Sequence, residues 1–171
     1  MLRKLAILPA FAIGLLASTV PGTCLAQTGK GSDNLVGAWR GQVQFTTGAF
    51  AETKDLEFMY VFTVGGTMTE SSNYDAAPPV PPAYGVWKKV GVRTYEARYH
   101  FFQSKAVSSP DELVKGGGWA PDGHGTLSQK IRLSADGNSF DSSITLELFD
   151  KGGKAIAGGG EASAKGRRIA F

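Results

Sequence analysis

The sequence is poor in the residue types that build disulfide, metal and helical frameworks. It contains one cysteine, Cys24, and two histidines, His100 and His124. A lone cysteine cannot close an intramolecular disulfide, and two histidines on separate segments lack the spacing of a metal pair. Beyond residue 30 no long stretch combines Ala, Glu, Lys and Leu, so the fold is expected to consist of strands. We expect no metal site and no cofactor.

An excess of charge of one sign is also missing. The chain has 18 Lys and Arg against 15 Asp and Glu, a formal net charge of +3. Two of the cations, Arg3 and Lys4, lie at the N-terminus, so the remainder carries 16 basic against 15 acidic residues. This balance lacks the electrostatic footprint of a nucleic-acid-binding surface. No nucleic-acid partner is expected.

Residues 1–26 have the three parts of a secretory signal peptide. Arg3 and Lys4 precede an apolar run over residues 5–16, and Cys24-Leu25-Ala26 supplies small side chains for cleavage after Ala26. The run is shorter than the ~20 residues of a membrane-spanning helix, which disfavours an uncleaved anchor; a lipidated Cys24 is a further alternative. The sequence therefore predicts a secreted or periplasmic protein whose mature chain has no cysteine.

The rest of the chain is expected to form a flexible lead, residues 27–34, and one domain, residues 35–171. Apolar and polar residues alternate through most of this domain, which is typical of strands with one buried face. We expect eight strands, at about residues 39–45, 56–64, 67–73, 84–90, 93–104, 126–134, 139–150 and 154–169. The proline-rich segment 76–83 and the glycine-rich segment 110–125 are expected to be loops, with at most a helical turn near Pro110.

Eight consecutive antiparallel strands can form a closed up-and-down barrel or a sandwich. Closure is favoured, because it removes both edge strands and needs only local connections. The faces opposite the apolar ones carry charges such as Lys130, Arg132 and Lys165, and these would face lipid in a membrane barrel at high cost. The sequence therefore predicts an all-β, eight-stranded antiparallel barrel that is water-soluble, with no stable membrane insertion.

Two positions sharpen this prediction. Gly37-Ala38-Trp39 opens the first strand, and Arg168 lies on the inward-compatible face of the last one, whereas Arg167 lies on the other face. A Gly-x-Trp at the start and an arginine near the end resemble the pattern of the calycin superfamily, which includes the lipocalins. The resemblance implies that Arg168 lies across Trp39 and closes the barrel floor. Because no room remains after the last strand for a lipocalin helix, the chain is more similar to the smaller allene-oxide-cyclase-like barrels, although no cyclase catalytic residue matches a position here.

Alternation projects many aromatic side chains into the barrel, together with small and polar ones such as Gly41 and Ser142. An eight-stranded barrel is either filled by such side chains or holds one small ligand, and the sequence leaves both possibilities open. The aromatic residues projected inward are Phe45, Phe58, Tyr60, Phe62, Trp87, Tyr95, Tyr99, Phe101 and Phe140. The candidate ligand-binding residues are Phe58, Tyr60, Phe62, Tyr95, Tyr99, Phe101, Trp119 and Gln129.

Candidate chemistry is sparse. Glu70 either points inward among the aromatic residues, where burial would raise its pKa and suit acid or base work, or is hydrated at a polar rim. His100 is expected on the outer surface and His124 in a loop. The leading expectation is binding of a small hydrophobic or aromatic molecule without catalysis. A cyclase or isomerase using Glu70 and an inward tyrosine, and a structural barrel with a filled core, are the alternatives; the oligomeric state stays open.

The mouth of the barrel is predicted at the end opposite Trp39 and Arg168. Up-and-down topology gathers the loops at about residues 46–53, 74–83, 105–125 and 151–153 there, and loops of this length commonly serve as lids or binding loops. Proline stiffening over residues 78–82 suits a fixed rim. Glycines 116–118 beside Trp119 suit a movable flap.

Overall fold

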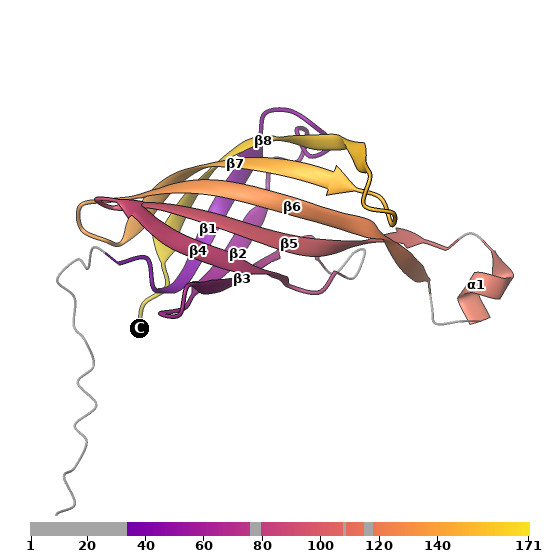
Figure 1. Cartoon of the computed structure of the whole chain (residues 1–171), viewed down its shortest axis with the longest axis horizontal. Helices are drawn as coiled ribbons and strands as arrows, with labels where there is room; N and C mark the ends of the chain where they lie inside the picture. Colours follow the sequence, from indigo (N-terminus) through magenta and orange to yellow (C-terminus); the bar gives the residue numbers. More distant parts are fainter. Residues whose placement is uncertain (1–33, 76–79, 108, 115–117) are drawn as a thin grey trace, which may run out of the picture.

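A computed structural model describes residues 34–75, 80–107, 109–114 and 118–171, which form a closed barrel of eight antiparallel strands (Figure 1). The predicted signal peptide and nearly all of the predicted lead lie outside the described residues. The strands are β1 (Gly37–Phe45), β2 (Glu57–Phe62), β3 (Thr67–Ser72), β4 (Ala83–Gly91), β5 (Thr94–Ala106), β6 (Trp119–Leu133), β7 (Ser139–Phe149) and β8 (Ala155–Arg168).

Each strand pairs with its neighbours in the sequence, and β8 returns to pair with β1. The closing register runs from Trp39 opposite Arg168 to Phe45 opposite Ala162. The backbone groups along both edges of the sheet are thereby hydrogen-bonded to each other. This closure confirms the predicted up-and-down barrel and rules out a sandwich. The one helix in the described part of the chain is α1 (Pro110–Val114), and no helix there is long and apolar enough to cross a membrane.

The predicted loop over residues 110–125 is wrong in its second half. Strand β6 begins at Trp119, and β5 continues to Ala106, so these two residues pair in an arm that projects from the barrel and bears α1 at its tip (Figure 1). Alternation did not predict this part of the strand, because Pro121, Gly123 and Gly125 interrupt the apolar pattern and these residue types are depleted in strands. The structure accommodates them with a shift in register between Gln103 and Ser104.

Trp39 and Arg168 lie together at the end of the barrel where β1 begins, which is the arrangement that the calycin resemblance implied. The Arg168 guanidinium carbon lies 4.2 Å from the centre of the Trp39 ring. The same guanidinium donates hydrogen bonds to the carbonyls of Val36 (2.6 Å), Asn34 (2.8 Å) and Gly137 (3.1 Å). Arg168 therefore ties the segment before β1 and the β6–β7 turn onto the indole.

Aromatic packing fills the half of the barrel next to this floor. Tyr60 stacks on Phe62 with ring centroids 5.8 Å apart and meets Tyr99 edge-on at 6.4 Å. Trp87 bridges Phe62 (6.0 Å) and Tyr95 (5.7 Å). All nine aromatic residues predicted to point inward are buried or partly buried in the barrel, and three of them, Phe45, Phe58 and Phe101, lie toward its other end. In the half next to the floor the described side chains are buried and in contact with one another.

Gly85 on β4 shows how tightly the strands approach each other. A Cβ at this position would lie 2.1 Å from the Arg98 carbonyl oxygen and 2.5 Å from the Tyr99 Cα, both backbone atoms that cannot turn aside. We expect Gly85→Ala to destabilise the protein by about 1–3 kcal/mol, the usual cost of overpacking. Urea unfolding followed by circular dichroism measures this difference.

Gly118 provides the matched control, because a Cβ there would meet no atom within 4 Å. Gly118→Ala is expected to change the free energy of unfolding by less than about 0.5 kcal/mol. Equal effects of the two substitutions would contradict the close approach of β4 and β5.

Candidate functional site

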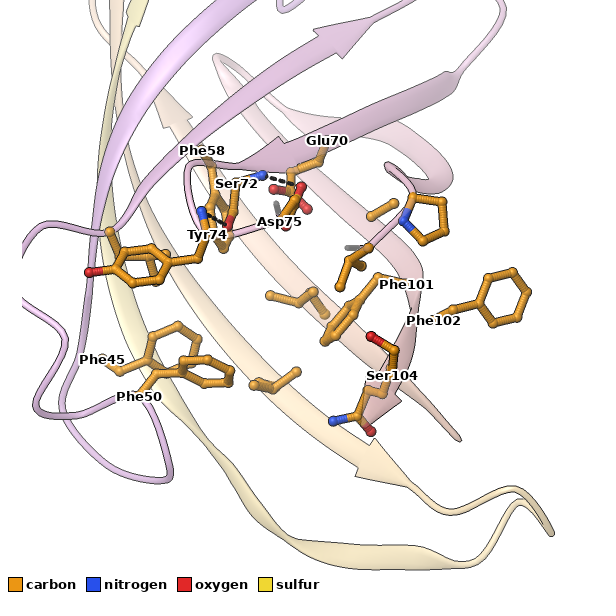
Figure 2. Close-up of a pocket in the computed structure, with 17 residues that line it drawn as sticks. Phe45, Phe50, Phe58, Glu70, Ser72, Tyr74, Asp75, Phe101, Phe102 and Ser104 are labelled. Carbon is orange, nitrogen blue, oxygen red and sulfur yellow. Dashed lines mark hydrogen bonds between the residues drawn. The ribbon is translucent and has the colours of Figure 1, made fainter. Parts of the chain in front are cut away.

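A pocket of about 270 Å³ opens at the barrel end opposite Trp39 and Arg168 (Figure 2). Its position agrees with the predicted mouth, since residues from the loops after β1 and β3 and from the far end of β5 line it. Most of the lining is apolar. The lining residues are Phe45, Phe50, Leu56, Phe58, Glu70, Ser72, Tyr74, Asp75, Val80, Pro81, Ala83, Phe101, Phe102, Gln103, Ser104, Leu127 and Leu146.

The predicted ligand-binding residues divide between this pocket and the packed core. Phe58 and Phe101 line the pocket. The others inside the barrel lie nearer to the floor and do not line it; these are Tyr60, Phe62, Tyr95, Tyr99 and Gln129. Alternation identified the inward face of each strand. It could not tell which inward residues border empty space, because that depends on the combined volume of the inward side chains from all eight strands.

Glu70 is the one charged residue among the buried side chains of the described chain, with 6% of its surface exposed. It stands opposite Tyr60 in the β2–β3 register and lines the pocket. Its Oε1 atom is buried and has no hydrogen-bond partner. Burial, reinforced by the nearby negative charge of Asp75, raises the pKa of the Glu70 carboxyl from 4.5 to about 8. The structure thus decides the question that the sequence left open, in favour of the inward position.

A line of polar side chains runs from Glu70 into the core. The buried Tyr60 hydroxyl lies next to it, and burial together with the charge of Glu70 raises the pKa of Tyr60 far above its usual value. Beyond it, the Tyr99 hydroxyl donates to Gln129 Oε1 at 3.4 Å, and Gln129 Nε2 donates to Ser142 Oγ at 2.8 Å. Both tyrosines therefore stay protonated, and the buried amide is held in one orientation.

The turn after β3 forms the rim beside Glu70 (Figure 2). The Asp75 carboxylate accepts a hydrogen bond from the Ser72 amide at 2.6 Å, and the Asp75 carbonyl accepts one from the Val80 amide at 2.7 Å. Tyr74 donates its hydroxyl to Asp55 at 2.5 Å. Sequence analysis missed Asp75, Tyr74 and Phe50 as site residues, although their place in the loops assigned to the mouth was an available signal.

Trp119 lies outside the pocket. It is 43% exposed and borders a shallower groove together with Ala120 and Gly123. That groove shares Pro81, Phe102, Gln103 and Ser104 with the pocket, so Trp119 flanks the mouth. Pro81 belongs to the predicted rim and does line the pocket, whereas residues 76–79 and most of the predicted glycine flap, 115–117, lie outside the described residues.

The histidines lie on the outside of the barrel wall. His100 is exposed and its Nδ1 atom is hydrogen-bonded to the Thr126 hydroxyl at 2.9 Å. His124, predicted in a loop, lies on β6 and stacks on Phe149 with ring centroids 4.9 Å apart. Among the described residues no three His, Cys, Asp or Glu side chains are grouped to hold a metal ion.

No known protein family and no curated protein matches this chain. Its function is therefore inferred from the fold and the pocket.

Proposed function

We propose that this protein is an exported binding protein that holds a small hydrophobic molecule in the pocket at the mouth of the barrel. The observation that carries the proposal is an apolar pocket of about 270 Å³ bordered by the unpartnered buried oxygen of Glu70. An apolar pocket with a few convergent polar groups is the usual form of a small-molecule site. The calycin-like architecture supports the same role.

The size of the pocket limits the ligand. Drug-sized ligands occupy clefts of about 300–1,000 Å³, so a pocket of about 270 Å³ favours a molecule with a single ring or a short chain. Phe45, Phe58 and Phe101 offer apolar surface to such a molecule, and Glu70 offers one polar anchor. A structural barrel with a completely filled core is disfavoured, because the packing stops short of the mouth.

Closing the pocket with a larger side chain tests the proposal. Val80 lies on the rim, lines the pocket and contributes only its backbone amide to the turn. We expect Val80→Trp to weaken the binding of propylbenzene, a neutral one-ring probe, by about tenfold or more. The larger side chain fills the pocket, so the probe loses its apolar contacts with the lining, and a tenfold loss corresponds to about 1.4 kcal/mol. Titration calorimetry measures the affinity.

Val86→Trp is the matched control, since Val86 is 61% exposed on the outer face of β4. It is expected to leave propylbenzene binding unchanged. If Val80→Trp and Val86→Trp bind the probe equally well, the ligand site is elsewhere.

The second candidate function is isomerisation by proton transfer. A carboxyl whose pKa is raised to about 8 is suited to general acid or base catalysis near neutral pH. In such a reaction Glu70 would take a proton from the carbon next to a ketone, the double bond would move, and Glu70 would return the proton at the far carbon. Tyr60 does not line the pocket, so Glu70 would act there without direct help from that tyrosine.

A small β,γ-unsaturated ketone such as 3-cyclohexenone is a suitable probe, because its conjugated product absorbs in the ultraviolet. If the protein is an isomerase of this kind, wild-type protein forms the product and Glu70→Gln reduces the rate to background, whereas Glu147→Gln, on the exposed face of β7, does not. A binder without catalysis gives no product with any of the three proteins.

A further inference from the structure

The charges around the mouth pocket are all of one sign. Glu70 and Asp75 line it, and no lysine, arginine or histidine is among the lining residues in the described chain. Two basic residues on the mouth segments have partners outside the pocket: Lys54 donates to the Ala51 carbonyl at 2.7 Å, and Lys105 pairs with Asp122 at 3.4 Å. When Glu70 ionises, its charge therefore has no counterion among the described lining residues.

The pocket also has acceptor atoms that need donors. Glu70 Oε1 is buried without a hydrogen-bond partner, and so is Gln103 Oε1, which belongs to another lining residue. An unsatisfied buried acceptor costs about 1–3 kcal/mol, and a bound molecule with N–H groups would recover that cost. A hydrocarbon would leave both oxygens unpaired.

Aromatic side chains complete the site. Phe45, Phe50, Phe58, Tyr74 and Phe101 surround the space in front of the carboxyl groups (Figure 2). The faces of such rings attract cations and also pack against apolar groups. Carboxylates and aromatic rings in one small pocket form a combination that suits an organic cation with a hydrophobic body.

We propose that the mouth pocket binds a hydrophobic primary amine as its ammonium ion, with Glu70 and Asp75 as the anionic partners and the phenylalanines around its apolar part. This inference rests on the proposed binding function and specifies the class of ligand. The ammonium group has three donors, which suit the free oxygen of Glu70. The two carboxyl groups would repel an anion. A neutral hydrocarbon would leave their negative charge without a counterion.

The proposal has a consequence for the pH dependence of binding. The groups that face Glu70 are Asp75 on the rim, Tyr60 on β2 and Tyr99 on β5, and both tyrosines stay neutral; the residue opposite on β4 is Ala83. Since the pKa of Glu70 is about 8 without ligand, an ammonium ion must bind the minor, ionised form below that pH. Affinity should therefore rise with pH, by about tenfold per pH unit between pH 6 and 7, and level off above 8.

The test compares three probes that share a phenylethyl group by titration calorimetry: 2-phenylethylamine, its neutral analogue of the same size, propylbenzene, and the slightly larger anion 3-phenylpropionate. An alkyl ammonium remains charged throughout pH 6–8.5, as lysine does. We expect the amine to bind at least about tenfold more tightly than propylbenzene at pH 8.5, with the rise in affinity described above, and the anion to bind most weakly. Propylbenzene affinity should not rise with pH.

Glu70→Gln removes the charge with little change of shape. At pH 8.5 it is expected to reduce the affinity for the amine by about a hundredfold or more and to abolish its pH dependence, while propylbenzene binding stays the same or improves; Glu147→Gln is the control. Equal affinity for the amine and propylbenzene, or tightest binding of the anion, would overturn the amine proposal and leave the binding function standing. Failure of all three probes to bind would overturn both.

Discussion

Trp39→Ala is expected to reduce the free energy of unfolding by about 3–5 kcal/mol, the range for removing a fully buried large aromatic residue. Trp39 has no exposed surface, and its ring lies 5.2 Å from that of Phe140 and under the Arg168 guanidinium. Its indole N–H donates to the Leu35 carbonyl at 2.9 Å. The substitution leaves a cavity, an unpaired buried carbonyl and an arginine without its platform.

The loss should exceed what the apolar area alone predicts, because Arg168 connects three separate segments. Without the indole, its hydrogen bonds to Asn34, Val36 and Gly137 no longer have a fixed geometry. Urea unfolding monitored by circular dichroism measures the change. Trp119→Ala, which removes a tryptophan that is 43% exposed, is expected to cost far less, and a similar loss for both variants would refute the floor-plug role of Trp39.

Glu70→Gln is expected to stabilise the protein at pH 8.5 and above relative to wild type, and to have little effect at pH 4. Folding raises the pKa of Glu70 from 4.5 to about 8, so the folded state holds its proton more tightly than the unfolded state. The stability that this proton contributes is complete below pH 4.5 and is lost progressively as the pH rises to about 8. At about 1.4 kcal/mol per pH unit, the full loss is about 5 kcal/mol, an upper limit.

Glutamine has nearly the same shape and never ionises, so the difference between the two unfolding free energies isolates this group. It is measured by urea unfolding of both proteins at intervals from pH 4 to pH 9. Glu147→Gln, on an exposed face, supplies the baseline for losing one surface carboxylate. A constant difference between wild type and Glu70→Gln over this range would mean that Glu70 is hydrated in the folded protein.

The burial of Glu70 has opposite effects on stability and on the proposed amine binding. Without a ligand, ionising the buried carboxyl costs free energy, and a bound cation would offset that cost. Functional residues commonly make a protein less stable than it would be with residues chosen for folding alone. A variant that gains stability at high pH and loses amine affinity is therefore the signature that links the two experiments.

The order and patterning of the strands predicted the barrel. Strict alternation defined the inward face of nearly every strand, and the glycine turn residues marked most hairpins. The resemblance of Trp39 and Arg168 to the calycin pattern implied which strands meet and which end is closed. Alternation is a local feature, because side-chain direction in a strand has a period of two wherever the strand lies.

Where side chains fill the barrel, and where a pocket remains, depends on packing between segments that are far apart in the sequence. Tyr60 and Phe58 are two residues apart on one face of β2, yet Phe58 lines the pocket and Tyr60 is packed beneath it. Glu70, on a strand rich in Thr and Ser, is buried because the turn containing Asp75 and the aromatic residues of β2 cover it. Trp119 looked like part of a flap and is instead paired with Ala106 in a strand. Volume, burial and pKa depend on side chains brought together from several strands and loops, and no local pattern along the chain contains that sum.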